Sequence, residues 1–244
     1  MIDLHCHFLP GIDDGAQVLG EALDLARAAV KAGIATSVMT PHVHIGRYDN
    51  NLTSIKKSVA AFRAALRAHD IPLEIRVGGE VRIAAELMTL VEEGEAPYLG
   101  ALDGHRILLL EFPHSHLMVG ADKLIQWLLA RKIKPLIAHP ERNKDVMRNV
   151  EKIHPFVAMG CLLQVTGASL TGEFGKPAQD CAVKLLEREW VTVVATDAHN
   201  LIHRPPDLGR ARKALAALAG EALAQRMTHD TPAAIVSANP WAGE

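Results

Sequence analysis

The chain opens with Met1-Ile2-Asp3-Leu4-His5-Cys6-His7, an apolar stretch that ends in two histidines with one residue between them. Side chains alternate faces in an extended chain, so His5 and His7 point the same way and can bind one metal ion. Near the other end, the apolar run 191–195 leads into Asp197-Ala198-His199, which repeats this spacing with a carboxylate added. The two pairs together predict a metal site built at strand ends.

Further apolar runs also end in residues that can bind a metal ion. They are followed by Pro41-His42, Gly79-Glu80, Glu111-Phe112-Pro113 and His139-Pro140-Glu141-Arg142. With the two terminal pairs, these candidates fall at six of the seven strand exits that the sequence predicts. Because the candidates were chosen by residue type alone, their position at strand exits supports both the site and the fold.

The alternation of strands and helices predicts an α/β fold. Strands are expected over 2–6, 35–40, 73–77, 107–110, 135–138, 162–165 and 191–195, and helices over 19–31, 53–68, 84–93, 120–131, 146–159, 176–188 and 208–227. Alternating βα units give a parallel sheet, and seven or eight in a row give a closed barrel with outer helices. No composition shift marks a boundary, so residues 1–244 are expected to form a single domain.

Composition narrows the functional class. The chain has 244 residues, 49% of them apolar, which supports a sizeable core and excludes disorder. A formal net charge of −2 gives no indication of a nucleic-acid or anionic-membrane surface. The three cysteines have no framework spacing, and no apolar run approaches membrane-spanning length, so we expect a cytoplasmic protein without membrane insertion. Cys6 is expected to face away from the histidine pair as a small buried residue.

Several candidate metal ligands could instead have an ordinary structural role. Glu80 could be an acid at a helix N-terminus, and Glu111 could pair with an arginine. Neighbouring prolines hold His42 and His139 in extended backbone. Asp14 is a candidate ligand in the loop 9–15, where Asp13 could be a turn-former.

The remaining polar residues near these strand ends complete the expected site. Nitrogen and carboxylate ligands without thiolate suit manganese, iron or zinc used for hydrolysis. The guanidinium groups of Arg142 and Arg204 match the oxygens of a phosphate, with a surface ion pair as the alternative for each. Tyr48 stands out in the polar loop 41–51. Four surplus histidines are not assigned as ligands: His44, His114, His116 and His203.

These residues resemble the polymerase-and-histidinol-phosphatase (PHP) superfamily, and within it the bacterial tyrosine-protein phosphatases of the capsule and exopolysaccharide type. The run Leu9-Pro10-Gly11-Ile12-Asp13-Asp14-Gly15 is the most specific match. The resemblance implies a distorted (β/α)₇ barrel with three divalent ions, commonly manganese, with iron, cobalt or zinc as alternatives. By motif position, the implied ligand sets are His5, His7, Glu80 and Asp197; Glu80, Glu111 and His139; and Asp14, His42 and His199. Arg142 and Arg204 match the phosphate-contacting arginines of that family.

The resemblance also implies an activity and a partner. We expect hydrolysis of protein phosphotyrosine by a hydroxide held on the metal ions, with the tail of a bacterial tyrosine autokinase that controls capsule synthesis as substrate. No Cys-x₅-Arg loop is present, so no cysteine nucleophile is expected. The alternatives are a phosphatase for a small metabolite such as histidinol phosphate, and a non-catalytic metal-binding regulatory module. A barrel amidohydrolase is disfavoured because no strand-end lysine is apparent.

Overall fold

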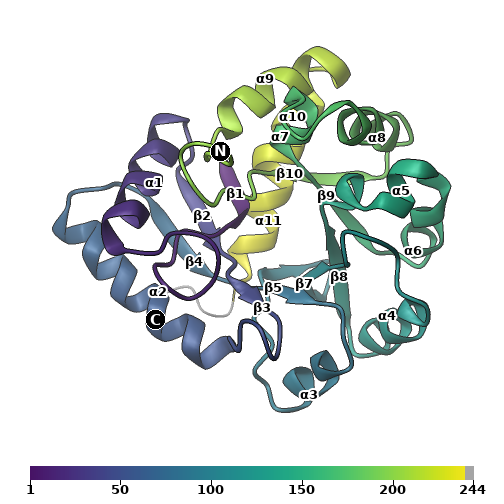
Figure 1. The fold of residues 1–244 in the computed structure, drawn as a ribbon, viewed down its shortest axis with the longest axis horizontal. Coiled ribbons are helices and arrows are strands. Elements are labelled where there is room, and N and C mark those ends of the chain that lie inside the picture. Colours follow the sequence, from purple (N-terminus) through teal and green to yellow (C-terminus); the bar gives the residue numbers. More distant parts are fainter. Residues whose placement is uncertain (240–244) are drawn as a thin grey trace.

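The computed structural model describes residues 1–239, and a central set of mostly parallel strands is surrounded by helices (Figure 1). The expected residues 240–244 of the domain lie outside this described range. The strands are β1 (Ile2–Cys6), β2 (Thr36–Met39), β3 (His42–Val43), β4 (Glu74–Val77), β5 (Glu80–Arg82), β6 (Gly100–Leu102), β7 (His105–Glu111), β8 (Ile133–Ala138), β9 (Leu162–Thr166) and β10 (Val191–Ala195). All seven predicted strands are therefore present, with ends shifted by up to two residues.

The strands form two groups that follow one another in space. One has the order β1-β2-β4, and the other has the order β10-β9-β8-β7-β5-β3, with β6 antiparallel to β7. The chain runs from β2 into β3 through Thr40-Pro41, and from β4 into β5 through Gly78-Gly79. A Cβ at residue 79 would lie 2.4 Å from the Pro97 ring, so only glycine allows this close approach. These two interruptions explain why β3 and β5 were not predicted as separate strands.

The first and last strands also meet. The amide of His7 donates to the Ala198 carbonyl at 2.9 Å, and the amide of Asp197 donates to the His5 carbonyl at 2.8 Å. A parallel bridge joins Cys6 to Ala198. Residues almost 200 positions apart in the sequence are thereby fixed side by side, which brings the two candidate metal-binding pairs together.

Helices cover the outside of the strands. They are α1 (Leu19–Lys31), α2 (Leu52–Ala68), α3 (Glu86–Glu92), α4 (Ala121–Ala130), α5 (Lys144–Arg148), α6 (His154–Ala158), α7 (Gly167–Thr171), α8 (Lys176–Glu187), α9 (Leu208–Ala219), α10 (Glu221–Gln225) and α11 (Thr231–Ser237), with short 3₁₀ segments η1 (Pro140–Arg142) and η2 (Val150–Ile153) and a π-helical segment η3 (Arg226–Asp230). α1 has the predicted bounds. α2 begins at a capping box in which Asn51 and Ser54 exchange side-chain and backbone hydrogen bonds. Within residues 1–239, no helix combines the length and the apolar character needed to cross a bilayer.

Two predicted helices are interrupted. The expected helix over 146–159 is divided into α5, η2 and α6, because Asn149 is extended (φ −151°) and its side chain caps the next turn. The expected helix over 208–227 ends at Gly220, whose φ of +90° is unfavourable for other residues, and continues as α10 and η3. Apolar periodicity continued across both breaks, so the pattern alone did not locate them.

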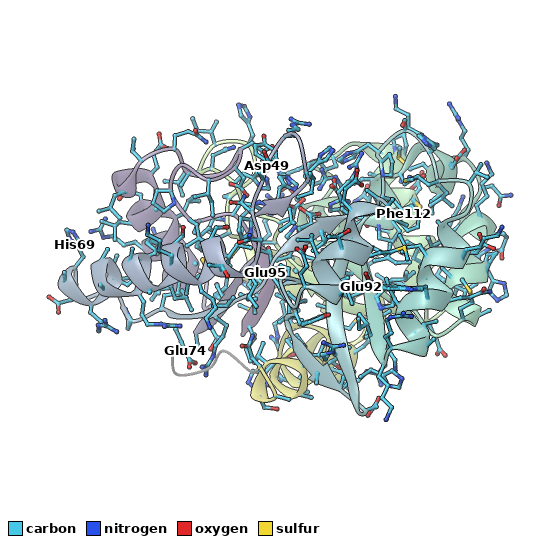
Figure 2. The ribbon with its side chains drawn as sticks, turned by 90° about the horizontal axis from the view of Figure 1, so that it is seen from below. Asp49, His69, Glu74, Glu92, Glu95 and Phe112 are labelled. Carbon is cyan, nitrogen blue, oxygen red and sulfur yellow. The ribbon has the colours of Figure 1, made fainter. Side chains whose placement is uncertain are left out.

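α11 closes one end of the strands. Ile235 and Val236 pack with Leu4, Leu109 and other strand residues in an inner apolar cluster. Figure 2 shows α11 at the lower edge beside Glu74, the first residue of β4, whereas Phe112, which follows the end of β7, lies on the upper side. The carboxyl ends of the strands therefore face away from α11, and that end carries the candidate site.

Candidate metal centre

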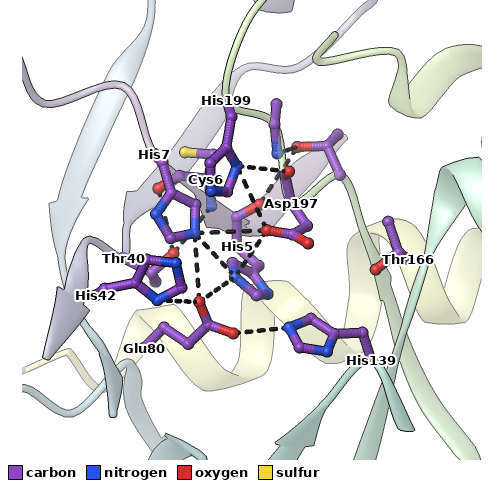
Figure 3. A network of polar contacts seen from close by, with 12 residues as sticks. His5, Cys6, His7, Thr40, His42, Glu80, His139, Thr166, Asp197 and His199 are labelled. Atoms are coloured by element: carbon purple, nitrogen blue, oxygen red, sulfur yellow. Dashed lines mark hydrogen bonds and ion pairs between the residues drawn. The ribbon is translucent and has the colours of Figure 1, made fainter. Parts of the chain in front are cut away.

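The candidate ligands gather at the carboxyl ends of the strands, and Figure 3 shows His5, His7, His42, Glu80, His139, Asp197 and His199 there. Asp14 and Glu111 belong to the same cluster. Three groups have ligand atoms that all lie within 4.8 Å of one another, and each group could hold a metal ion: His5, His7, Glu80 and Asp197; His7, Asp14, His42 and His199; and His42, Glu80 and Glu111. Side chains from β1, β3, β5 and β7 and from the segments after β1, β8 and β10 contribute to this cluster.

The groups agree with the implied ligand sets in most members. The first group is the implied set, and the second is the implied set with His7 added. The third group contains His42 with Glu80 and Glu111, whereas the implied set has His139 in place of His42. His139 is nevertheless next to this group, because its Nε2 lies 2.8 Å from Glu80 Oε1.

Hydrogen bonds on the outer nitrogens orient three of the histidines. Nδ1 of His5 lies 2.9 Å from Gln164 Oε1, Nδ1 of His7 lies 2.7 Å from Asp13 Oδ2, and Nδ1 of His199 lies 3.0 Å from the Asp197 carbonyl. Carbonyl and carboxylate oxygens only accept, so Nδ1 carries a proton in each ring, and in the neutral form that binds a metal ion Nε2 has the lone pair. These lone pairs face the cluster, as metal-binding histidines require.

Asp13 and Gln164 are functional candidates that sequence reasoning missed. Asp13 does form a turn, since its Oδ1 accepts from the Gly15 amide at 3.0 Å, but its Oδ2 also accepts from His7 and from the His42 amide at 3.0 Å. Gln164 is fully buried within β9. A polar residue inside an otherwise apolar strand was the signal available for Gln164, whereas nothing in the sequence distinguished Asp13 from an ordinary turn residue.

Buried lone pairs in the cluster fit a cation. Glu80 Oε2, Asp197 Oδ1 and His199 Nε2 are buried and receive no well-oriented hydrogen bond from residues 1–239. Glu80 Oε2 lies 3.2 Å from His5 Nε2, and Asp197 Oδ1 also lies 3.2 Å from that atom. Buried polar atoms without partners are costly, and a divalent ion removes this cost. The set of nitrogen and oxygen donors without thiolate is the kind that hydrolytic metal ions take.

Electrostatics of the cluster favour the same conclusion. Burial opposes the charge on Glu80, but neighbouring His5 and His42 hold its pKa well below the ordinary value. Burial likewise opposes a charge on His42, yet Glu80 and Asp14 raise its pKa to about 10. Protons on imidazoles thus balance the carboxylates when no cation is bound. Divalent ions would take the place of these protons, so metal binding should release protons.

Two candidate ligands have strained backbone. His139 has φ +34° and Asp197 has φ +53°, both in the left-handed region that residues other than glycine rarely adopt. The extended backbone predicted for His139 is therefore wrong, because this residue turns the chain from β8 into η1. Burial, together with the positive charge of Arg142, lowers the pKa of His139 to about 3, so this imidazole is neutral and able to bind a metal. Such strain persists only where the surroundings enforce it, and it concentrates at functional sites.

Both predicted phosphate-binding arginines reach the cluster. Arg142, in η1, and Arg204, in the loop after β10, each donate to Asp197 Oδ2. Their partner is buried, so the alternative of a surface ion pair does not describe either residue. Glu111, in contrast, does pair with an arginine as its alternative proposed, because Arg82 Nη1 lies 2.9 Å from Glu111 Oε2. This pair leaves Glu111 inside the third group.

Part of the cluster lines a hollow of about 470 Å³, namely Asp14, His42, Glu80, Glu111 and His139. His44, Tyr48 and His114, which had no assigned role, also line it, whereas His203 lines a neighbouring smaller pocket. Cys6 is buried and its thiol donates to the Val38 carbonyl at 3.4 Å, away from the cluster as expected. Burial and the charge of Asp3 raise the pKa of the Cys6 thiol well above its usual value, so it is not a nucleophile.

The sequence matches the family described as capsular polysaccharide synthesis, CpsB/CapC, over residues 1–237. This chain belongs to the CpsB/CapC family. The CpsB/CapC chain is 38% identical over 202 residues to tyrosine-protein phosphatase YwqE of Bacillus subtilis (strain 168), covering 82% of this chain and 78% of YwqE. It is 28% identical over 241 residues to tyrosine-protein phosphatase CpsB of Streptococcus pneumoniae, covering 97% and 98% of the two chains.

Solved structures agree with this assignment. A crystal structure from work on YwqE and CpsB, described as unique metal-dependent tyrosine phosphatases, matches with a TM-score of 0.91 and 32% identity, and the match covers 98% of this CpsB/CapC chain and 95% of the other. A β-aspartyl dipeptidase from Fervidobacterium islandicum matches with a TM-score of 0.59 and 13% identity, which shows a similar fold alone. The α/β fold with parallel strands and outer helices is thereby confirmed.

Proposed function

We propose that this CpsB/CapC chain is a metal-dependent phosphatase that removes phosphate from tyrosine residues of proteins. The observation that carries the proposal is the convergence of eight nitrogen and carboxylate ligands, with His139 beside them, next to two arginines at one open hollow. The relatives YwqE and CpsB are named tyrosine-protein phosphatases, and the matching crystal structure is of a metal-dependent one. A bacterial tyrosine kinase tail in capsule synthesis is the substrate we propose, in the cytoplasm.

The finer architecture belongs to the same proposal. We infer one domain with a distorted (β/α)₇ barrel, supported by the parallel pairings along each of the two strand groups and by the contact between β1 and the segment after β10. We infer three divalent ions, with manganese as the first candidate, supported by the three ligand groups. His5, His7, Asp14, His42, Glu80, Glu111, Asp197 and His199 would hold them, with His139 beside Glu80.

The residues of the chain have distinct tasks in the reaction. When bound, divalent ions lower the pKa of water and neutralise an anionic substrate. Arg142 and Arg204 offer planar donors to the phosphate oxygens, where charge spreads as the bond to the tyrosine oxygen breaks. Both now share Asp197, and a phosphate would compete for the same donors. A tyrosine phenol, with a pKa of about 10, leaves more readily than an alkoxide, so strong acid assistance is not required.

A comparison of substrates tests the proposal. The protein supplied with manganese should hydrolyse a phosphotyrosine peptide faster than histidinol phosphate, and a chelator should abolish the activity until manganese is restored. Faster turnover of histidinol phosphate would favour the metabolite phosphatase. Tight manganese binding without hydrolysis of any phosphomonoester would favour the regulatory module.

A further inference from the structure

Charged residues around the hollow are distributed unevenly. The acids that line it are Asp14, Glu80 and Glu111, all members of the metal-binding groups, and the cations that line it are Arg47, Arg82, Arg142, Lys144 and Arg204. Outside the ligand cluster, the charged lining is therefore entirely basic. The whole chain has a formal net charge of −2, so this basic mouth does not simply reflect composition.

Two of these cations have no acidic partner. Arg142 and Arg204 pair with Asp197, and Arg82 pairs with Glu111. Arg47 and Lys144, which we call the mouth cations, are exposed and form no ion pair with any residue of the described range 1–239. Unpaired cations beside a hollow attract anionic groups and strengthen binding most at low salt.

A well-defined turn holds Arg47 at the hollow. The amide of His44 donates to the Tyr48 carbonyl at 3.0 Å, the amide of Tyr48 donates back at 2.7 Å, and the Gly46 amide donates to Asp49 Oδ1 at 2.6 Å. The guanidinium carbon of Arg47 lies 5.1 Å from the centre of the Tyr48 ring. That ring is nearly parallel to the His42 imidazole, with 5.5 Å between the ring centres. Arg47 is thus placed close to a candidate metal ligand, and Asp49 of the same turn lies on the upper side in Figure 2.

Lys144 is fixed by a different part of the chain. It is the first residue of α5, and its amide donates to the His114 carbonyl at 2.8 Å. The preceding Asn143 donates to the Pro113 carbonyl at 2.7 Å and caps α5. These bonds attach Lys144 to the loop after β7, whose residues Pro113, His114 and Ser115 also line the hollow.

We propose that Arg47 and Lys144 each provide an anion subsite at the hollow, so that the preferred substrate is a phosphotyrosine with another anionic side chain nearby. Arg142 and Arg204 are already placed for the phosphate that reacts, which leaves the mouth cations for a different anion. A carboxylate of Asp or Glu and the phosphate of a second phosphotyrosine share the required chemistry. This inference rests on the proposed function and deepens it by naming the substrate class.

Peptides of equal length test the subsite. Each peptide has one central phosphotyrosine, flanked by neutral residues, by Asp and Glu, by a second phosphotyrosine, or by Lys. For the manganese-loaded protein, kcat/KM should be about threefold to tenfold higher with anionic than with neutral flanks, mainly through KM, because exposed charge pairs are individually weak. Arg47→Gln with Lys144→Gln should reduce this ratio toward one, and the ratio should also decrease as salt is raised. The acidic and doubly phosphorylated peptides separate the two sources of the anion.

A matched control removes the same charge elsewhere. Arg226 and Lys213 are exposed and do not line the hollow, so Arg226→Gln with Lys213→Gln should preserve the ratio. The proposal is overturned if wild type shows no preference for anionic flanks, or if the control lowers the ratio as much as the mouth variant does. Failure to hydrolyse any phosphotyrosine peptide would instead overturn the proposed function.

Discussion

Replacing Asp13 with Asn should weaken metal binding by changing the proton position on His7. Asp13 is buried and accepts three hydrogen bonds, from His7 Nδ1 at 2.7 Å and from the amides of Gly15 and His42 at 3.0 Å each. Asn has one oxygen and one NH₂ group in the same space. If the NH₂ group faces His7, Nδ1 must accept and the proton moves to Nε2, which removes the lone pair aimed at the cluster. If the NH₂ group faces Gly15 instead, it meets the Gly15 amide N–H, and two hydrogen-bond donors then face each other without an acceptor.

The size of this effect follows from the contacts. Loss of a partner that orients a metal-binding histidine typically reduces metal affinity 10- to 100-fold, or about 1.4–2.7 kcal/mol. One lost hydrogen bond to a charged acceptor costs about 1.5–3 kcal/mol of folding stability. Both groups that contain His7 should be affected, and most of all His7, Asp14, His42 and His199, because Asp13 contacts or adjoins three of its members.

Manganese titration by calorimetry, with metal content measured after dialysis, checks this prediction. Asp24→Asn is the matched control, since Asp24 is exposed and, within residues 1–239, forms an ion pair only with Arg27 on α1. The variant should lose affinity at some of its sites while the control keeps the wild-type profile. An unchanged titration for Asp13→Asn in a folded protein would refute the reasoning that Asp13 orients His7.

Three further outcomes are expected. Arg142→Ala should lower kcat about 10²- to 10³-fold with metal content retained, measured by phosphopeptide turnover and metal analysis; unchanged kcat would remove Arg142 from phosphate contact. Iodoacetamide should leave activity intact, because burial raises the pKa of Cys161 and Cys181 to about 12 and that of Cys6 well above its usual value; mass spectrometry would detect any reaction. Burial raises the pKa of Asp3 from 3.8 to about 6 against the hydrogen bonds from Thr196, so the folded state holds this proton more tightly than the unfolded state. In chelator, wild type should therefore lose about 2 kcal/mol of stability relative to Asp3→Asn as pH rises from 4 to 6, which denaturant titrations would measure; a difference independent of pH would contradict it.

Much of the fold was predictable because its signals are local. Short apolar runs bounded by glycine, proline and polar residues located all seven main strands, and the helix predicted over 19–31 has the bounds of α1. The breaks at Asn149 and Gly220 were missed, because apolar periodicity reports burial and not the backbone angle of one residue. β6 was missed because three residues, Gly100 to Leu102, give no detectable alternation.

Part of the candidate site was also predictable from local sequence, and part of it was not. The pairs His5/His7 and Asp197/His199 could be predicted because the alternation of side chains along a strand depends only on the local sequence. The contact of Arg82 with Glu111 and the position of His139 beside Glu80 could not be predicted from the sequence, since they depend on strand register and loop packing.

The sequence by itself determined the donor atoms and the strand ends that carry them, because residue type and backbone periodicity are properties of short segments. Only the tertiary structure decided that His7 belongs to two groups, that Asp13 and Gln164 orient histidines, and that Arg47 and Lys144 remain unpaired within the described residues. These features are distances of a few ångströms between segments far apart in the chain. Such distances are set by how strands pair and loops pack, which no local pattern encodes.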